Sequence, residues 1–329
     1  MARHNLSKLT DSLDIPCAGR EPSPMPPRTT ATLLCVVSLL RGGVLRAQAP
    51  VATDLWRLAA GTLVVPPALA EDGSAALWTP AAVLPPSGAG MRIGIEAVHS
   101  PSEIGVNGGV ATIGLRAGRL GTVNLVYGRM GVDGLVRTET SPEAIGGDIA
   151  VFNEVLSVGL ARTIGAGFTA GIAARALSGR LDIANSSQFG LDLGLRYADS
   201  SRVSFGIATR FFDPSLRAAE SGASYSAAVS YRTAESPVWG TTADLRFWYG
   251  AGWAHGEGMQ HLLSVGLELG GVAEVDLGAA REETAGIELW RSRLGVSLDV
   301  GRFRVYLGRD GGVNGFGATY RFGLAAGMM

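Results

Sequence analysis

The chain has 329 residues, 47 of them glycine, and a formal net charge of −1 at pH 7. This is roughly twice the usual glycine content of about 7%, but no Gly-X-Y period accompanies it, which excludes a collagen-like triple helix. Arginines spread singly along the chain carry nearly all the positive charge. The sequence therefore lacks the basic footprint of a nucleic-acid-binding protein, and we expect no nucleic-acid partner.

Residues 1–49 predict an N-terminal extension and a signal peptide. Arg28 precedes an apolar stretch from Ala31 to Leu40, and Ala47-Gln-Ala49 matches an A-x-A cleavage site. The apolar stretch is shorter than the roughly 20 residues that a bilayer-spanning helix needs. We therefore predict export with cleavage near Ala49.

Two features of this N-terminal region bear on the mature protein. Translation could begin at Met1 or at Met25, because residues 1 to 24 are polar and rich in proline. Both cysteines, Cys17 and Cys35, precede the proposed cut, so the mature chain would contain no thiol and no disulfide. A soluble exported protein and an outer-membrane protein both remain open at this point.

Residues 50–90 do not follow the pattern of the rest of the chain. They contain a short helical candidate beginning at Asp54 and a Val-Val-Pro-Pro break at 64–67. The segment is too short to form a separate domain. We predict a hatch that plugs the lumen of a barrel or lies beneath it.

From residue 91 onward, stretches of 8 to 12 residues alternate apolar with small or charged side chains, and a turn follows each. An aliphatic face opposed to a small, charged face is typical of a barrel that faces lipid outside and water inside. We predict an all-β fold, a transmembrane antiparallel β-barrel of about fourteen strands over 91–324, with a C-terminal tail at 325–329. The predicted strands are 91–98, 108–118, 121–130, 150–162, 167–176, 188–198, 202–212, 222–232, 240–250, 260–269, 273–281, 293–300, 302–308 and 314–324.

The predicted connections alternate in length, as they do in membrane barrels with long outer loops and short periplasmic turns. Most connections after even-numbered strands are tight, although 233–239 is longer. Both chain ends would then be periplasmic. The long connections follow odd-numbered strands and are 99–107, 131–149, 177–187, 213–221, 251–259 and 282–292.

The last predicted strand carries a short motif. Tyr320, Phe322 and Leu324 share its apolar face, and Gly317-x-x-Tyr320-x-Phe322 resembles the C-terminal β-signal of bacterial outer-membrane proteins. The resemblance implies that Gly317, Tyr320 and Phe322 address the chain to the outer-membrane assembly machinery.

A second resemblance lies in the hatch. Asp72-Gly-Ser-Ala-Ala-Leu-Trp78-Thr79-Pro80-Ala resembles the stretch that opens PorV/PorQ-like and FadL-like outer-membrane proteins, which are fourteen-stranded barrels with an N-terminal hatch. The closing hairpins, from Ala273 onward, resemble those of PorV/PorQ-like proteins more than those of FadL-like proteins. Thr79 stands where that family has asparagine.

The resemblance implies one of two functions in the bacterial outer membrane, with its lipid as surroundings. FadL-like members pass hydrophobic small molecules across the membrane through the hatch and a lateral opening. PorV-like members shuttle or anchor secreted proteins. Neither class supplies catalytic residues or a cofactor to carry over, so we expect no cofactor.

The sequence gives little sign of enzymatic chemistry. It has no G-x-S-x-G nucleophile elbow. His255, Glu257 and His261 could in principle bind a metal ion, but a polar loop beside Trp253 is the favoured interpretation. We predict neither a catalytic nor a metal site.

The alternation directs many charges toward the lumen, since charged side chains facing lipid would be costly. A paired arginine–carboxylate ladder that fills the lumen is the favoured interpretation, and an anion-biased path lined by unpaired arginines is the alternative. Six aromatic residues near strand ends are expected to form interfacial girdles: Tyr127, Tyr197, Phe211, Tyr231, Tyr249 and Phe322. The predicted lumen charges are Arg116, Arg175, Arg196, Arg210, Arg232, Arg246, Arg304, Arg321, Asp192, Asp244, Glu268, Asp276 and Asp299.

Overall fold

A computed structural model describes ten stretches of the chain, all of them within the unit Leu45–Met329. The predicted signal peptide and cleavage site, as well as His255 and Glu257, lie outside the described residues. The described stretches are 53–82, 90–101, 105–136, 149–198, 202–214, 222–238, 240–254, 258–284, 287–312 and 317–328.

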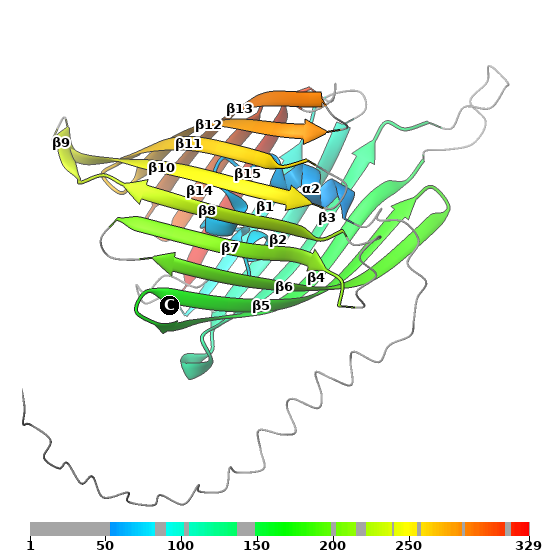
Figure 1. Ribbon diagram of the computed structural model, residues 1–329, viewed down its shortest axis with the longest axis horizontal. Helices are drawn as coiled ribbons and strands as arrows, with labels where there is room; N and C mark the ends of the chain where they lie inside the picture. Colours follow the sequence, from blue (N-terminus) through cyan, green and yellow to red (C-terminus); the bar gives the residue numbers. More distant parts are fainter. Residues whose placement is uncertain are drawn as a thin grey trace, which may run out of the picture. The chain divides into compact units, whose positions relative to one another are not determined.

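The architecture is a closed, antiparallel β-barrel of fourteen strands (Figure 1). Apart from β9, each strand pairs with the strands that precede and follow it along the chain; β15 pairs with β1, and β10 pairs with both β8 and β11. The additional short strand β9 pairs only with the start of β10. The strands are β1 Met91–His99, β2 Gly105–Arg116, β3 Thr122–Asp133, β4 Val151–Gly165, β5 Phe168–Leu181, β6 Ala184–Ala198, β7 Val203–Phe212, β8 Ser224–Arg232, β9 Ser236–Val238, β10 Thr241–Ala254, β11 Gln260–Leu269, β12 Ala273–Thr284, β13 Ile287–Val300, β14 Phe303–Asp310 and β15 Thr319–Met328.

The predicted fold class is confirmed, and its cause is visible in the alternation of side chains. In β4, Leu156 and Val158 are 56% and 52% exposed, while Val155 and Ser157, which alternate with them, are buried. Closing the sheet gives every strand a paired neighbour and removes the free edges that a membrane cannot solvate. Apolar side chains therefore cover the outer wall, and small, polar or charged ones face the lumen.

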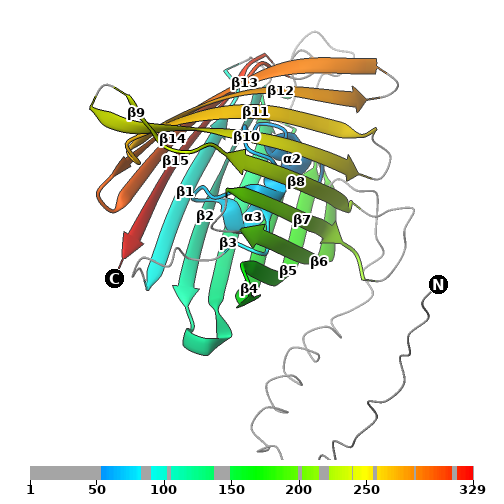
Figure 2. The same cartoon turned by 60° about the vertical axis from the view of Figure 1, so that its left-hand side comes forward.

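Four short helices accompany the strands. The helices α2 (Asp54–Ala60), η1 (Pro67–Leu69) and α3 (Ala75–Trp78) belong to the hatch and lie inside the ring of strands, and η2 (Gly118–Leu120) forms the turn between β2 and β3 (Figure 2). No helix among the described residues is long and apolar enough to cross a bilayer.

The hatch and the inner wall share a hydrophobic core. Trp56, Leu77 and Trp78 of the hatch are buried against inward-facing side chains such as Val126 and Val155. A segment with too few residues for its own core is thus ordered by burying its apolar side chains within the barrel.

Three details differ from the sequence-based expectations. The connection predicted as a long loop at 177–187 is a tight hairpin, because β5 reaches Leu181 and β6 resumes at Ala184, with Asp182 at φ 55° in the turn. Likewise β12 extends to Thr284 and β13 begins at Ile287, within the predicted loop 282–292. Interstrand hydrogen bonds thus continue beyond the apolar segments from which we predicted strand lengths.

The third difference concerns the end of the chain. Residues 325–328 belong to β15 rather than to a tail, since Met328 pairs with Met91 and Ala326 pairs with Phe303. The small side chains of Ala325 and Ala326 continue the inward–outward alternation. Gly317, with φ 72°, precedes the strand instead of lying within it.

Candidate functional site: a plugged lumen

Glycines on the inner wall allow the hatch backbone to approach the strands closely. A Cβ atom at Gly171 of β5 would overlap the carbonyl oxygen of Pro80, and one at Gly94 of β1 would overlap that of Gly73. Any larger residue would push the hatch off the wall. Part of the glycine surplus in the sequence therefore serves to seat the hatch.

The predicted hatch motif forms a connected polar turn. Asp72 Oδ1 accepts hydrogen bonds from the backbone N–H and the hydroxyl of Ser74, both at 3.0 Å. The Ser74 hydroxyl in turn accepts a hydrogen bond from the buried indole of Trp78 at 2.8 Å. Thr79 is buried and accepts a hydrogen bond from the N–H of Ala81 at 3.3 Å. These residues fix the shape of the hatch next to Pro80.

Arg321 of the closing strand joins this turn to the wall. It is fully buried, forms an ion pair with Glu96 of β1 and donates to the Ser74 hydroxyl at 3.1 Å. It also donates to the Thr62 hydroxyl at 3.3 Å, and its guanidinium lies over the Trp78 ring. One arginine therefore links two strands to two parts of the hatch.

A β-bulge holds a second buried pair. The register between β6 and β7 shifts around Asp192, and Phe211 takes φ 58°, a value that is rare for a bulky residue. Asp192 pairs with Arg175, and Arg175 donates to the carbonyl oxygen of Leu77 in the hatch at 2.6 Å. The bulge turns Phe211 into the core, where it lies against the Arg175 guanidinium.

The expectation that Phe211 belongs to an aromatic girdle is therefore wrong, because the extra residue of the bulge reverses its direction. Tyr127, Tyr231, Tyr249 and Phe322 do face outward, with 46% to 54% of each side chain exposed. Tyr197 stacks on Phe205.

At the end of the barrel with the short turns, charges form an extended network. Arg232 binds Asp244 at 2.8 Å and Glu268 at 2.6 Å, and Arg246 binds Glu268 at 3.1 Å. Nearby, Arg304 binds Glu274 at 2.7 Å and Asp299 at 3.5 Å.

Glu71 brings the hatch into this network. It pairs with Arg196 and lies 3.6 Å from Arg246. The side chain of Glu71 is 48% exposed, so the desolvation that favours its protonated form is only partial, and the guanidinium groups of Arg196 and Arg246 hold the pKa of Glu71 below its ordinary value.

Towards the opposite end, four buried charges form a compact quartet. Arg291 and Arg293 each bind both Glu282 and Asp310, with Arg291 to Asp310 at 2.8 Å and Arg293 to Asp310 at 3.0 Å. Arg293 also donates to the carbonyl oxygen of Leu63 in the hatch at 2.8 Å. Two arginines and two carboxylates make the quartet neutral.

Three predicted lumen charges stand apart from these networks. Arg116 is exposed at the end of β2. Asp276 and Arg210 are buried, and neither forms an ion pair with any residue that the structure describes. Most charges in the described lumen are nevertheless paired, as the hypothesis of an arginine–carboxylate ladder predicts.

Six further charged residues face the lumen and were not predicted from the sequence: Glu71, Glu96, Glu282, Arg291, Arg293 and Asp310. The alternation could have indicated Glu96 and Arg293, since both occupy inward positions of predicted strands. Their partners depend on the register between strands, which alternation does not specify.

The histidines contribute no metal site among the described residues, where no group of three or more His, Cys, Asp or Glu side chains could hold an ion. His261 contacts the Tyr249 hydroxyl at 2.9 Å, and His99 contacts Asn107.

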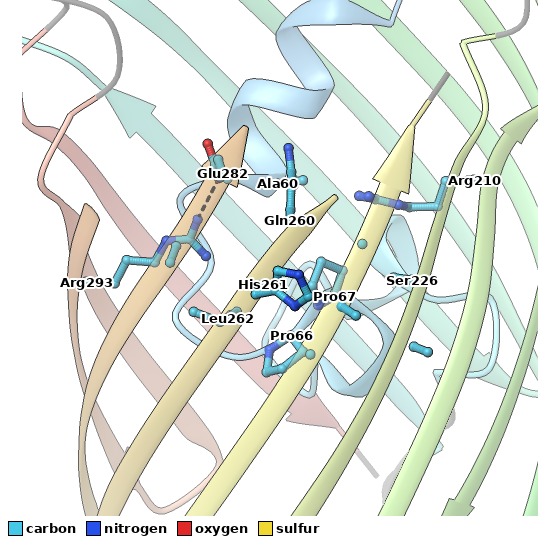
Figure 3. A pocket seen from close by; sticks show the side chains of 16 residues that line it. Ala60, Pro66, Pro67, Arg210, Ser226, Gln260, His261, Leu262, Glu282 and Arg293 are labelled. Carbon is cyan, nitrogen blue, oxygen red and sulfur yellow. Dashed lines mark hydrogen bonds and ion pairs between the residues drawn. The ribbon is translucent and has the colours of Figure 1, made fainter. Parts of the chain in front are cut away.

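The hatch leaves small cavities in the lumen. One of about 50 Å³ lies between the hatch residues Ala60 and Pro66 and the wall residues Arg210, Ser226 and Gln260 (Figure 3). Two others measure about 40 and 30 Å³. On the outer wall, an open apolar groove of about 670 Å³ crosses β5 to β8 and β10. Its sides are formed by exposed apolar residues, among them Leu193, Ile207, Tyr225, Trp253 and Met259.

Comparison with protein-family models gives no match, and comparison with curated proteins gives none either. Among solved structures, the chain is similar to the Pseudomonas putida toluene transporter TodX, with 11% identity and a TM-score of 0.49 over 81% of this chain and 95% of that one. It is also similar to the Acinetobacter baumannii outer membrane protein Omp33, with 9% identity and a TM-score of 0.44 over 73% and 98% of the chains. A third similar structure is the KdgM porin, with 9% identity and a TM-score of 0.38 over 72% of this chain and 99% of that one. At such identities and TM-scores below 0.5, these similarities assign neither a family nor a substrate.

Proposed function

We propose that the protein is a barrel of the bacterial outer membrane that allows passive movement of a small hydrophobic or amphipathic solute past its hatch. The outer wall supports the location, because its apolar side chains suit lipid contact. This is the FadL-like alternative of the two functions that the hatch motif implies. Export by the predicted signal peptide and assembly through Gly317, Tyr320 and Phe322 complete the proposal, which includes no catalytic step.

One observation carries the proposed movement of solute. The cavity of about 50 Å³ in the lumen and the apolar groove of about 670 Å³ on the outer wall share four lining residues, Ser226, Ala227, Ala251 and Gly252. All four are small, so the wall between cavity and groove is thin at the pairing of β8 with β10. A solute that entered the lumen beside the hatch would reach the lipid by the shortest distance here.

The lumen cavities are too small for a solute to pass, so transport requires the hatch to shift. Besides the shared hydrophobic core, polar contacts attach the hatch, such as Ser264 to the Val64 carbonyl at 2.6 Å and Arg293 to the Leu63 carbonyl. Water can replace such contacts at little net cost, since a typical hydrogen bond contributes only about 1 kcal/mol net.

Swelling of liposomes that contain the purified protein tests the proposal. The solutes are arabinose and a short-chain zwitterionic sulfobetaine, and protein-free liposomes give the background. We expect sulfobetaine flux above background and slower entry of arabinose. Background flux for every solute would exclude the channel function.

A PorV-like shuttle or structural role is the second candidate. The paired buried charges and the buried hatch favour it, because together they fill and stiffen the lumen. In this case, the outer loops would carry the function, and the barrel would remain impermeable in the swelling assay.

A further inference from the structure

Arg210 differs from the other buried arginines of the described lumen in having no countercharge. Its side chain projects inward from β7 and is buried, with 6% exposed. Neither Nε nor Nη1 has a hydrogen-bond partner in the described part of the chain. Its ring contact is with Trp78, with the guanidinium carbon 5.7 Å from the ring centroid. Burying a guanidinium without an anion carries a large desolvation cost.

The charged neighbours of Arg210 do not offset this cost. Asp192 is already paired with Arg175, and Arg57 adds another positive charge nearby. The quartet around Glu282, which also borders the cavity, is neutral by itself. The positive charge of Arg210 is therefore in excess on this side of the lumen.

A cavity lies directly in front of the guanidinium. Figure 3 shows Arg210 pointing from its strand toward Gln260, and both residues line the cavity together with Ala60 of the hatch. The volume of about 50 Å³ exceeds the roughly 30 Å³ that one water molecule occupies in the liquid, so a group of a few heavy atoms fits.

A second unused polar group stands beside the arginine. Ser224 of β8 lies directly opposite Arg210 in the antiparallel register, is buried, and has a hydroxyl without a hydrogen-bond partner in the described structure. Side chains in directly opposite positions have Cβ atoms only about 5 Å apart. Ser224 is not among the residues that line the cavity, so the Arg210 guanidinium supplies the hydrogen-bond donors on this side of it.

We propose that Arg210 forms a binding site for a small carboxylate, of the size of formate or acetate, in the lumen cavity beside the hatch. The planar guanidinium can present two parallel N–H groups to the two oxygens of a carboxylate, which a spherical halide cannot match. The site is independent of the proposed transport, since a sealed barrel can hold the anion as well as a channel can.

The test uses the full mature chain in detergent micelles, at constant ionic strength maintained with sodium gluconate, whose anion is too large for the cavity. Sodium acetate is titrated while the thermal transition is followed by the loss of heat-modifiable migration on gels. We expect a saturable rise of the transition temperature for wild type, and none for Arg210→Met. Without acetate, Arg210→Met should be at least as stable as wild type, because a buried, unpaired charge has been removed.

Arg293→Met is the matched control, because Arg293 borders the same cavity but is paired with Glu282 and Asp310. It should be less stable than wild type both with and without acetate, and the rise with acetate should remain.

A measurement on the wild type keeps the proposal testable if a variant does not fold. Acetate should change the tryptophan fluorescence saturably, since Trp78 lies next to Arg210, whereas chloride should not. A loss of stability in Arg210→Met without acetate would mean that the chain itself supplies the countercharge, and the proposal would be wrong. Saturation by chloride at equal concentrations, or tighter binding of hexanoate than of acetate, would also overturn the assignment of a small carboxylate.

Discussion

Asp192 Oδ1 accepts a hydrogen bond from the backbone N–H of Phe211 at 2.7 Å, and the same carboxylate pairs with Arg175. A single side chain therefore holds the bulge in the wall and positions the arginine that binds the hatch carbonyl of Leu77. This relationship makes the stability of the wall depend on the seating of the hatch.

Replacing Arg175 with methionine should strongly destabilise the barrel. Asp192 would lose its ion-pair partner, and removing one partner of a buried pair typically costs about 3–5 kcal/mol. The free energy of unfolding in urea, measured after refolding into lipid vesicles, gives the value. The double variant Arg175→Met/Asp192→Asn should recover part of the loss, and a double variant less stable than the single one would contradict the pairing.

Gly171→Ala should displace the hatch, because the added Cβ would overlap the Pro80 carbonyl oxygen. Overpacking of this kind costs roughly 1–3 kcal/mol. We expect a lower unfolding free energy and a higher ionic conductance in planar bilayers. Gly323→Ala is the matched control, since a Cβ there would meet no atom closer than 3.7 Å. Equal behaviour of the two variants would show that the hatch does not press on Gly171.

Glu71 should make stability depend on pH at the acidic end. The pKa of Glu71 is lower in the folded barrel than in the unfolded chain, where it is about 4.3. The contribution of Glu71 to the free energy of unfolding is therefore fully present above about pH 4.3, and it is lost as the pH falls through the pKa of the folded state. Wild type should therefore exceed Glu71→Gln in stability by a constant amount at pH 6 to 8, and the two curves should converge below about pH 4. A difference that persists at pH 2.5 would exclude the ion pairs with Arg196 and Arg246 as its cause.

Phe322→Ala should impair assembly in the cell more than refolding in vitro. Phe322 is 54% exposed on the lipid face, so its loss removes little packing inside the protein. We expect less folded barrel in the outer-membrane fraction but a near-normal yield in detergent refolding. Leu324→Ala, on the same face of β15 but outside the motif, should fractionate as wild type does. An equal decrease of folded barrel in the outer-membrane fraction for both variants would argue against a specific assembly signal.

Alternation of side chains was sufficient to predict fourteen strands and the direction of most lumen charges, because facing lipid or water is a local property of each position. It failed where one residue breaks the period, as at Phe211. It also underestimated strand length at Leu181 and Ala184, where pairing continues past the apolar segment.

The partners of the charges could not be predicted, since the contacts of Glu71 with Arg196 and of Arg321 with Ser74 join positions more than 100 residues apart. They depend on the path of the hatch through the lumen, which follows no periodic pattern. Even the hatch motif indicated only that a hatch exists and not where it is seated.

A reversible cross-link between hatch and wall tests the central claim, that solute passes only when the hatch shifts. Val64 Cγ2 lies 3.3 Å from where a Cβ of residue 295 would be, close to the sulfur-to-Cβ separation across a disulfide. In the variant Val64→Cys/Gly295→Cys, with no other cysteine after residue 49, we predict background sulfobetaine flux in oxidised liposomes and wild-type flux after reduction by dithiothreitol. Equal flux in the oxidised and reduced states, with the disulfide verified by mass spectrometry, would contradict the account.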